Sequence, residues 1–135
     1  MATITPNTWG PSGWKFIHFV ALGYPKNPTT EDMNSYQRFY ESLQDILPCA
    51  VCSEHYKELI QQYPVSEHLH DKHTLFKWSV DIHNNVNKRL GKSTVSYEKA
   101  LSFYTDSSSS ILSILCKIVI VILLLLAIYH ILLHK

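Results

Sequence analysis

The chain has few of the residues from which phosphate loops, disulfide frameworks and nucleic-acid surfaces are built. Only four glycines occur in 135 residues, and they form neither a GxGxxG fingerprint nor a Walker loop. Three cysteines are too few for a disulfide-rich scaffold. A net charge of +1 without a basic stripe argues against nucleic acid as a partner. The first residues carry neither a basic start nor an apolar run, so we expect no secretory signal.

A long apolar run is present at the other end. Residues 111–133 contain Lys117 as their only formal charge, and a helix of that length spans roughly 35 Å, enough to cross a bilayer. The sequence thus predicts a domain over 1–105, a Ser-rich linker over 106–110 and a C-terminal transmembrane helix. Cys116 lies inside the span, where we expect an apolar filler.

The position of this span leads to an expectation about topology. A membrane helix so close to the C-terminus would insert after translation, which predicts a tail anchor with the preceding domain on the cytosolic side. The alternative is an apolar helix buried in an oligomer, although the run is apolar on every face.

The first 105 residues are predicted to be all-α. Apolar residues recur at helical spacing in four successive segments, and a short fifth helix is expected over residues 97–104. The first helix ends before Gly23, a capping box formed by Thr29 and Asp32 opens the second, and the fourth, over 71–90, ends at a C-cap glycine, Gly91. We therefore expect four helices plus a short fifth one.

Two cysteines stand close together as Cys49-Ala50-Val51-Cys52. Pro48 is a favoured first helical residue, so both cysteines are predicted in the first turn of the third helix. Free backbone N–H groups there lower the pKa of a thiol, and the i, i+3 spacing puts both sulfurs on one face. The pattern predicts a dithiol–disulfide switch, with Cys49 the more exposed site of attack and Cys52 facing the interior.

Two other readings of the cysteine pair stay open at this point. The cysteines could be reduced structural residues, or they could form half of a zinc site. Zinc ligands would have to come from the nearby histidines, among which only His68 and His73 stand at a familiar spacing; the candidates are His55, His68, His70 and His73. We predict no metal.

A dithiol needs a cofactor to pass electrons to oxygen, and two segments carry suitable groups. Aromatic, imidazole and amide side chains on facing helices suit an aromatic ligand with polar edges, and lysines could contact a pyrophosphate. Taken singly, each of these residues could equally be core or solvated surface. The candidates are Trp9, Gly10, Trp14 and His18 in the first segment, and His83, Asn84, Asn87, Lys88 and Lys92 in the second.

The combination of motifs is more specific than its parts. WGxxxWxxxH, then YP, then PCxxC and finally HNxVNxxLGK resemble, in order and spacing, the Erv/ALR family of FAD-linked sulfhydryl oxidases. The resemblance extends from Trp9 to Tyr104. It implies a four-helix bundle with a short fifth helix, non-covalently bound FAD, and a homodimer.

The resemblance also implies roles for individual residues. Cys49 and Cys52 match the redox-active pair, with Cys52 next to the isoalloxazine ring. A substrate thiolate would attack Cys49, and the electrons would pass through FAD to oxygen and give hydrogen peroxide. The residues that match the family's flavin-binding positions are Trp9, Gly10, Trp14, His18, His83, Asn84, Val86, Asn87, Leu90, Gly91, Lys92 and Tyr104.

The chain also departs from the family pattern. It lacks the second, shuttle cysteine pair of many relatives, and Pro11 stands where a basic residue is usual. It is most similar to the compact forms of large cytoplasmic DNA viruses, some with a membrane anchor, so a host or virion membrane is expected. The expected partner is a protein thiol, such as a CxxC carrier. The competing hypotheses are a flavin-free thiol–disulfide carrier and a zinc-stabilised membrane adaptor.

Overall fold

The computed structural model describes residues 4–105 and 108–133, and this part of the chain contains helices and no strands. The predicted all-α class is confirmed. The chain divides into two compact units, residues 1–97 and 98–135, and each is described by itself. In order, the helices are α1 (Pro6–Leu22), α2 (Thr30–Ile46), α3 (Ala50–Gln62), the 3₁₀ helix η1 (Val65–His68), α4 (Lys72–Arg89), α5 (Tyr97–Ser102) and α6 (Ser108–Leu133).

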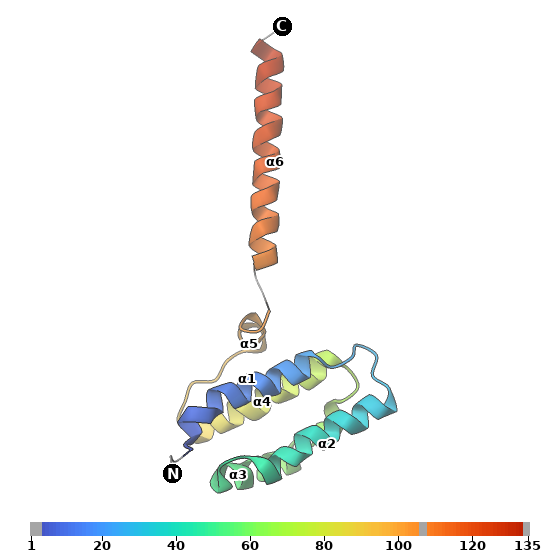
Figure 1. Cartoon of the computed structure of the whole chain (residues 1–135), viewed down its shortest axis with the longest axis vertical. Helices are drawn as coiled ribbons and strands as arrows, with labels where there is room; N and C mark the ends of the chain where they lie inside the picture. Colours follow the sequence, from blue (N-terminus) through green and yellow to red (C-terminus); the bar gives the residue numbers. More distant parts are fainter. Residues whose placement is uncertain (1–3, 106–107, 134–135) are drawn as a thin grey trace. The chain divides into compact units, whose positions relative to one another are not determined.

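The first unit is an antiparallel bundle. Helix α1 packs on α4, α2 packs on α3, and α3 also contacts α4 (Figure 1). Because successive helices alternate in direction, α1 and α3 begin where α2 and α4 end (Figure 1). We call this end of the bundle, where Cys49 lies, the Cys49 end.

Aromatic residues with polar tips connect the bundle helices. Tyr24, Tyr40 and Trp78 are at most 2 % exposed. A buried hydroxyl or indole N–H is costly unless it is hydrogen-bonded, and each of these groups donates to a backbone carbonyl of another segment. The bonds run from Tyr24 to Leu69, Tyr40 to Ile17, Tyr56 to Tyr40 and Trp78 to Tyr63. Burial also raises the pKa of Tyr40 and of Tyr56, which keeps both phenols neutral.

Several predicted helix ends are found where the sequence placed them. The Thr29 hydroxyl accepts from the Asp32 N–H at 3.1 Å, and the Asp32 carboxylate accepts from the Thr29 N–H at 2.8 Å, which completes the capping box. Asp71 caps α4 by accepting from the Thr74 N–H at 2.8 Å. Gly91 has φ 66°, the left-handed conformation that a C-cap glycine provides.

Other helix ends differ from the prediction. Helix α1 begins at Pro6 and includes Pro11, whereas the sequence predicts the first helix only after Pro11. Pro6 suits the first helical position, because the N–H that proline lacks would have no intrahelical partner there. Helix α5 ends at Ser102, two residues before the predicted Tyr104.

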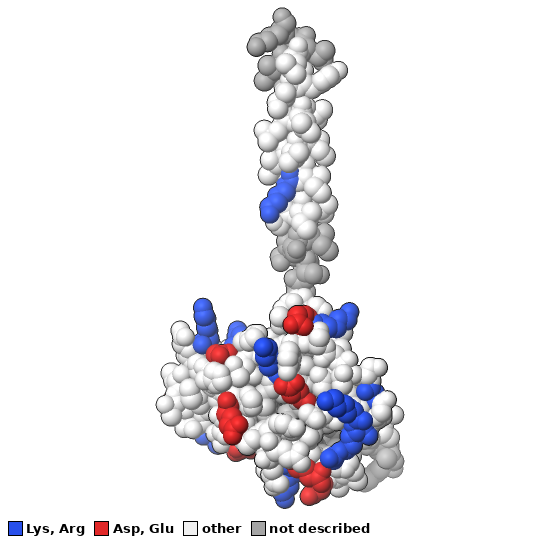
Figure 2. All heavy atoms as spheres, turned by 180° about the vertical axis from the view of Figure 1, so that it is seen from behind, with Lys and Arg blue, Asp and Glu red and all other residues white. Residues whose placement is uncertain are grey.

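The second unit contains most of α5 and the apolar helix α6. The window Ser113–His130 has a mean hydropathy of 2.5 and none of it is buried. Among the described residues, α6 is one helix that is both long enough and apolar enough to cross a membrane. On the face seen in Figure 2, the described part of α6 is almost entirely uncharged, whereas lysine, arginine and acidic groups are mixed over the bundle. Helix α6 begins at Ser108, inside the predicted linker, of which Asp106 and Ser107 lie outside the described residues.

Candidate active site

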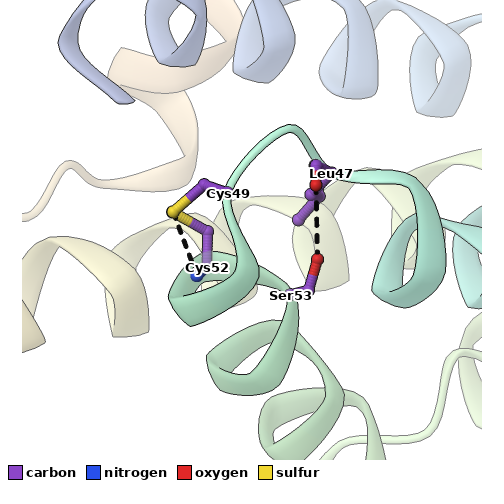
Figure 3. The surroundings of a disulfide bond; sticks show 4 residues. All are labelled: Leu47, Cys49, Cys52 and Ser53. Atoms are coloured by element: carbon purple, nitrogen blue, oxygen red, sulfur yellow. Dashed lines mark hydrogen bonds between the residues drawn. A yellow bond between two sulfur atoms is a disulfide. The ribbon is translucent and has the colours of Figure 1, made fainter. Parts of the chain in front are cut away.

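Cys49 and Cys52 are joined by a disulfide with their Cα atoms 5.2 Å apart (Figure 3). Cys49 is the N-cap of α3, with φ −160° and ψ 108°, and Ala50 is the first helical residue. The prediction that Pro48 opens the helix and that Cys49 lies within its first turn was therefore wrong. Cys49 Sγ instead accepts a hydrogen bond from the Cys52 N–H at 3.2 Å.

The turn before α3 explains this difference. The Cys49 N–H donates to the Leu47 carbonyl at 2.8 Å, which closes a three-residue turn around Pro48, a residue with no N–H of its own to satisfy. The Ser53 hydroxyl lies 3.5 Å from the same carbonyl (Figure 3). This turn keeps Cys49 extended and places its sulfur over the start of α3.

The N-cap position has a chemical consequence for the reduced pair. The Cys52 N–H and the positive end of the helix dipole both favour negative charge on Cys49 Sγ, so Cys49 is the thiolate that the geometry stabilises. Both cysteines are half-buried, and the greater exposure expected for Cys49 stays a prediction. Cys116 is a free, exposed cysteine of α6.

Four side chains from α1 and α4 form a second group, which we call the imidazole cluster: Trp14, His18, Ser79 and His83. Trp14 and His83 stack with ring centroids 4.1 Å apart and planes within 5°. His18 Nε2 lies 3.0 Å from His83 Nδ1, and His18 Nδ1 lies 2.9 Å from the Ser79 hydroxyl. The structure thus brings together Trp14, His18 and His83, which were predicted as cofactor-binding residues from two separate segments of the sequence.

Both imidazoles of this cluster are neutral near pH 7. Burial, assisted by the neighbouring His83, lowers the pKa of His18 to about 4. Burial also lowers the pKa of His83 to about 4, and the positive charge of Lys92 adds to the effect. Sequence reasoning missed Ser79. The available signal was a serine one turn before His83, on the same face of a helix as His83.

Trp9 carries a buried polar atom without a partner. Its indole Nε1 is buried and finds no acceptor in the part of the chain that the structure describes, a costly state that a bound acceptor would relieve. Gly13, which the sequence analysis did not single out, lies under this ring: a Cβ there would be 3.1 Å from two Trp9 ring carbons. A Cβ at Gly10 would meet nothing within 4 Å.

The end of α4 positions the remaining candidates. The Asn84 amide donates to the Val95 carbonyl at 2.9 Å and accepts from the Val95 N–H at 3.0 Å, so it fastens the segment after Gly91 to α4. The Lys92 N–H donates to the Asn87 carbonyl at 2.8 Å. Val86 and Asn87 are half-buried, whereas the exposed residues are Lys88, Leu90, Gly91 and Lys92.

Two remaining expectations concern Tyr104 and metal. Tyr104 follows α5 in the second unit and is half-buried, and burial raises the pKa of its phenol; its role toward a cofactor stays a prediction. Among residues 4–105 and 108–133, no three His, Cys, Asp or Glu side chains gather in a way that could hold a metal. The zinc alternative therefore has no candidate ligand set in this part of the chain.

The chain is thus a small helical bundle that carries the Cys49–Cys52 disulfide at its Cys49 end and the imidazole cluster on α1 and α4. The Erv1/Alr family matches residues 11–105, and the chain belongs to this family. A protein of Acanthamoeba polyphaga mimivirus named a probable FAD-linked sulfhydryl oxidase is 42 % identical over 73 % of this chain and 69 % of its own length.

Two further comparisons agree with this assignment. A protein of Invertebrate iridescent virus 6, also named as an FAD-linked sulfhydryl oxidase, is 37 % identical over 68 % of this chain and 87 % of its own. The crystal structure of the FAD binding domain of Erv1 from Saccharomyces cerevisiae matches with a TM-score of 0.67 at 26 % identity, covering 70 % of this chain and 89 % of that one.

Proposed function

We propose that this protein is an FAD-linked sulfhydryl oxidase, which forms disulfide bonds in protein thiols. The observation that carries the proposal is the disulfide between Cys49 and Cys52 at the start of α3, within a bundle whose family relatives are named for this activity. The start of α1 and the end of α4 also lie at the Cys49 end (Figure 1).

The thiol chemistry follows from the helix start. A substrate thiolate attacks Cys49 Sγ and releases Cys52 as a thiolate; a second substrate thiolate then attacks the mixed disulfide at the substrate sulfur and releases Cys49. Two substrate thiols thereby become one disulfide, and the pair takes up two electrons and two protons. The Cys52 N–H and the helix dipole stabilise the Cys49 thiolate, which makes Cys49 a good leaving group in this second step.

FAD fits the groups that α1 and the C-terminal part of α4 offer. When bound, the flavin accepts the two electrons of the dithiol and passes them to oxygen, giving hydrogen peroxide. The buried Trp9 Nε1 needs an acceptor, neutral His83 and Trp14 offer stacked aromatic faces, and the Lys92 charge suits phosphate. We propose that FAD contacts Trp9, Gly10, Trp14, His18, His83, Asn84, Val86, Asn87, Leu90, Gly91, Lys92 and Tyr104, with Cys52 next to the flavin ring.

A spectrum of the purified full chain in detergent tests the proposal. A yellow protein with the flavin absorption band, which consumes oxygen and releases hydrogen peroxide when given dithiothreitol, is the expected result. A colourless protein that exchanges disulfides would support the flavin-free carrier. A colourless protein with bound zinc would support the adaptor. Either outcome would overturn the oxidase.

We further propose the setting in which the enzyme works. Helix α6 anchors the protein in a host or virion membrane, two copies form a homodimer, and the electron donor is a protein thiol such as a CxxC carrier. The apolar, unburied window of α6 supports the anchor, and exposed phenylalanines of α1 support the dimer. Placement of the bundle on the cytosolic side stays a prediction.

A further inference from the structure

A chain of hydrogen bonds crosses the imidazole cluster from the α4 backbone to His83. The Ser79 hydroxyl donates to the Phe76 carbonyl oxygen at 2.7 Å. Ser79 Oγ also lies 2.9 Å from His18 Nδ1, and His18 Nε2 lies 3.0 Å from His83 Nδ1. Ser79 is 0 % exposed and His18 is 2 % exposed, so these contacts form away from bulk water, where hydrogen bonds are strong and unpaired groups are costly.

The first bond of this chain decides the direction of the others. A carbonyl oxygen only accepts, and Ser79 has a single hydroxyl hydrogen. If that hydrogen pointed at His18, the Ser79 and Phe76 oxygens would face each other at 2.7 Å with no proton between them. The hydrogen therefore lies toward Phe76, Ser79 Oγ accepts from His18, and His18 carries its hydrogen on Nδ1.

The position of the hydrogen on His18 then decides which histidine donates in the bond between His18 and His83. A neutral imidazole carries one hydrogen, and both rings are neutral because burial lowers the pKa of each to about 4. His18 Nε2 thus bears a lone pair and accepts from the Nδ1–H of His83, which leaves His83 Nε2 without a hydrogen. The Trp14 ring, stacked on His83 at 4.1 Å, fixes the plane of the same imidazole.

We propose that Ser79 is a positioning residue: through His18 it fixes the tautomer of His83, which then offers an unprotonated Nε2 to a hydroxyl or N–H group of the cofactor. This inference rests on the proposed function. Ser79 acts only through His18, yet it determines whether His83 presents an acceptor or a donor to its ligand.

Removing the Ser79 hydroxyl should reverse the direction of the hydrogen bond between His18 and His83. In Ser79→Ala, a hydrogen on His18 Nδ1 would lose the acceptor that Ser79 Oγ provides in this buried site, which is costly. The less costly arrangement moves that hydrogen to Nε2, which then donates to His83 Nδ1, and His83 carries its own hydrogen on Nε2. A donor would then meet a donor of the cofactor, and we expect FAD affinity to fall about tenfold. Ser79→Thr keeps the hydroxyl and should restore the wild-type tautomers and affinity.

Helix α2 provides a matched control. The Ser42 hydroxyl donates to the Phe39 carbonyl at 2.7 Å, the same bond to a carbonyl three residues earlier that Ser79 makes in α4. Ser42→Ala removes this bond without touching the imidazole cluster. It should leave the tautomers and the affinity for FAD unchanged.

Nitrogen NMR of the full chain in detergent, labelled with ¹⁵N-histidine, shows which ring nitrogen carries hydrogen. Because the pKa values of His18 and His83 are about 4, both rings stay neutral and their signals should not change between about pH 5 and 8. We expect Nδ1–H on both in the wild type and Nε2–H on both in Ser79→Ala, with FAD affinity measured by titration of flavin absorbance.

An Nε2–H signal from either residue in the wild type would overturn the inference, even if Ser79→Ala does not fold. Unchanged tautomers in a folded Ser79→Ala variant would overturn it as well. Either result in a yellow protein leaves the proposed function intact, whereas a colourless wild type overturns the proposed function itself.

Discussion

At the scale of single residues, the proposed chemistry depends on the sulfurs of Cys49 and Cys52 and does not require the sulfur of Cys116. Cys49→Ser and Cys52→Ser should each abolish oxygen consumption with dithiothreitol, because either change removes the disulfide that accepts electrons. Cys116→Ser should keep full activity, since Cys116 is a free cysteine of α6. All three variants should retain FAD in their absorption spectra. Full activity in either the Cys49 or the Cys52 variant would refute the assignment of the redox pair.

The neutral histidines predict how stability depends on pH. His18 and His83 have pKa values of about 4 in the fold, below the ordinary value of 6.5. Between these values the unfolded chain binds more protons, so stability is complete above pH 6.5 and falls as pH decreases toward 4. Thermal unfolding should show this slope. His83→Gln should reduce this slope by up to about 1.4 kcal/mol per pH unit, whereas Ser42→Ala, which removes no titratable group, should leave the slope unchanged; equal slopes in the wild type and in His83→Gln would contradict a neutral His83.

At the scale of a single helix, two glycines of α1 should respond in opposite ways to alanine. Alanine in a helix is favoured over glycine by about 1 kcal/mol, and a Cβ at Gly10 meets nothing; Gly10→Ala should therefore stabilise the FAD-free protein by roughly that amount. A Cβ at Gly13 lies 3.1 Å from the Trp9 ring, so Gly13→Ala should displace Trp9, lower FAD affinity and gain no stability.

Thermal melts and flavin titrations of both glycine variants provide the measurement. A Gly13→Ala protein that binds FAD as the wild type does would contradict a role for the Trp9 ring position. If Gly10→Ala stabilises the FAD-free protein but binds FAD more weakly, the space beside Gly10 is occupied by the cofactor.

The elements also show what the sequence could and could not predict. Local signals sufficed for the capping box at Thr29, for Gly91 and for the helical periods, since each depends on neighbours in the chain. The predicted start of α3 was wrong because the Cys49 N–H donates to the Leu47 carbonyl. The preference of proline for the first helical position does not reveal that hydrogen bond. Ser79 stands one turn before His83 on the same face of α4, which was a local signal, but its partner His18 lies on another helix, and the sequence does not show that contact.

At the scale of the whole molecule, the surface of α1 predicts self-association. Phe16 and Phe19 are 60 % and 45 % exposed and lie one turn apart, and paired large apolar side chains on a surface commonly mark an interface. Replacing both by serine should convert the proposed homodimer to a monomer in sedimentation of the detergent-solubilised protein. Ile46→Ser, at a position 67 % exposed on α2, is the control and should stay dimeric. A dimer that persists in the double variant would place the interface elsewhere.

The anchor is the last prediction at this scale. None of the window Ser113–His130 is buried, and the first unit has its own core around Tyr40 and Trp78. Removing residues 106–135 should therefore cost the bundle no packing, and the remaining domain should be yellow, active and soluble without detergent. The full chain should stay with membranes through alkaline carbonate washing, because an apolar helix of this length partitions into the bilayer.

The truncation also distinguishes the two readings of the apolar helix. A bundle that unfolds or loses FAD after the cut would show that α6 packs on protein, as in the oligomer alternative. A full chain released by carbonate would point the same way. For a membrane-bound protein, protease added outside intact microsomes decides the side: digestion of the bundle places Cys49 in the cytosol, and protection places it in the lumen, where the tail-anchor expectation fails.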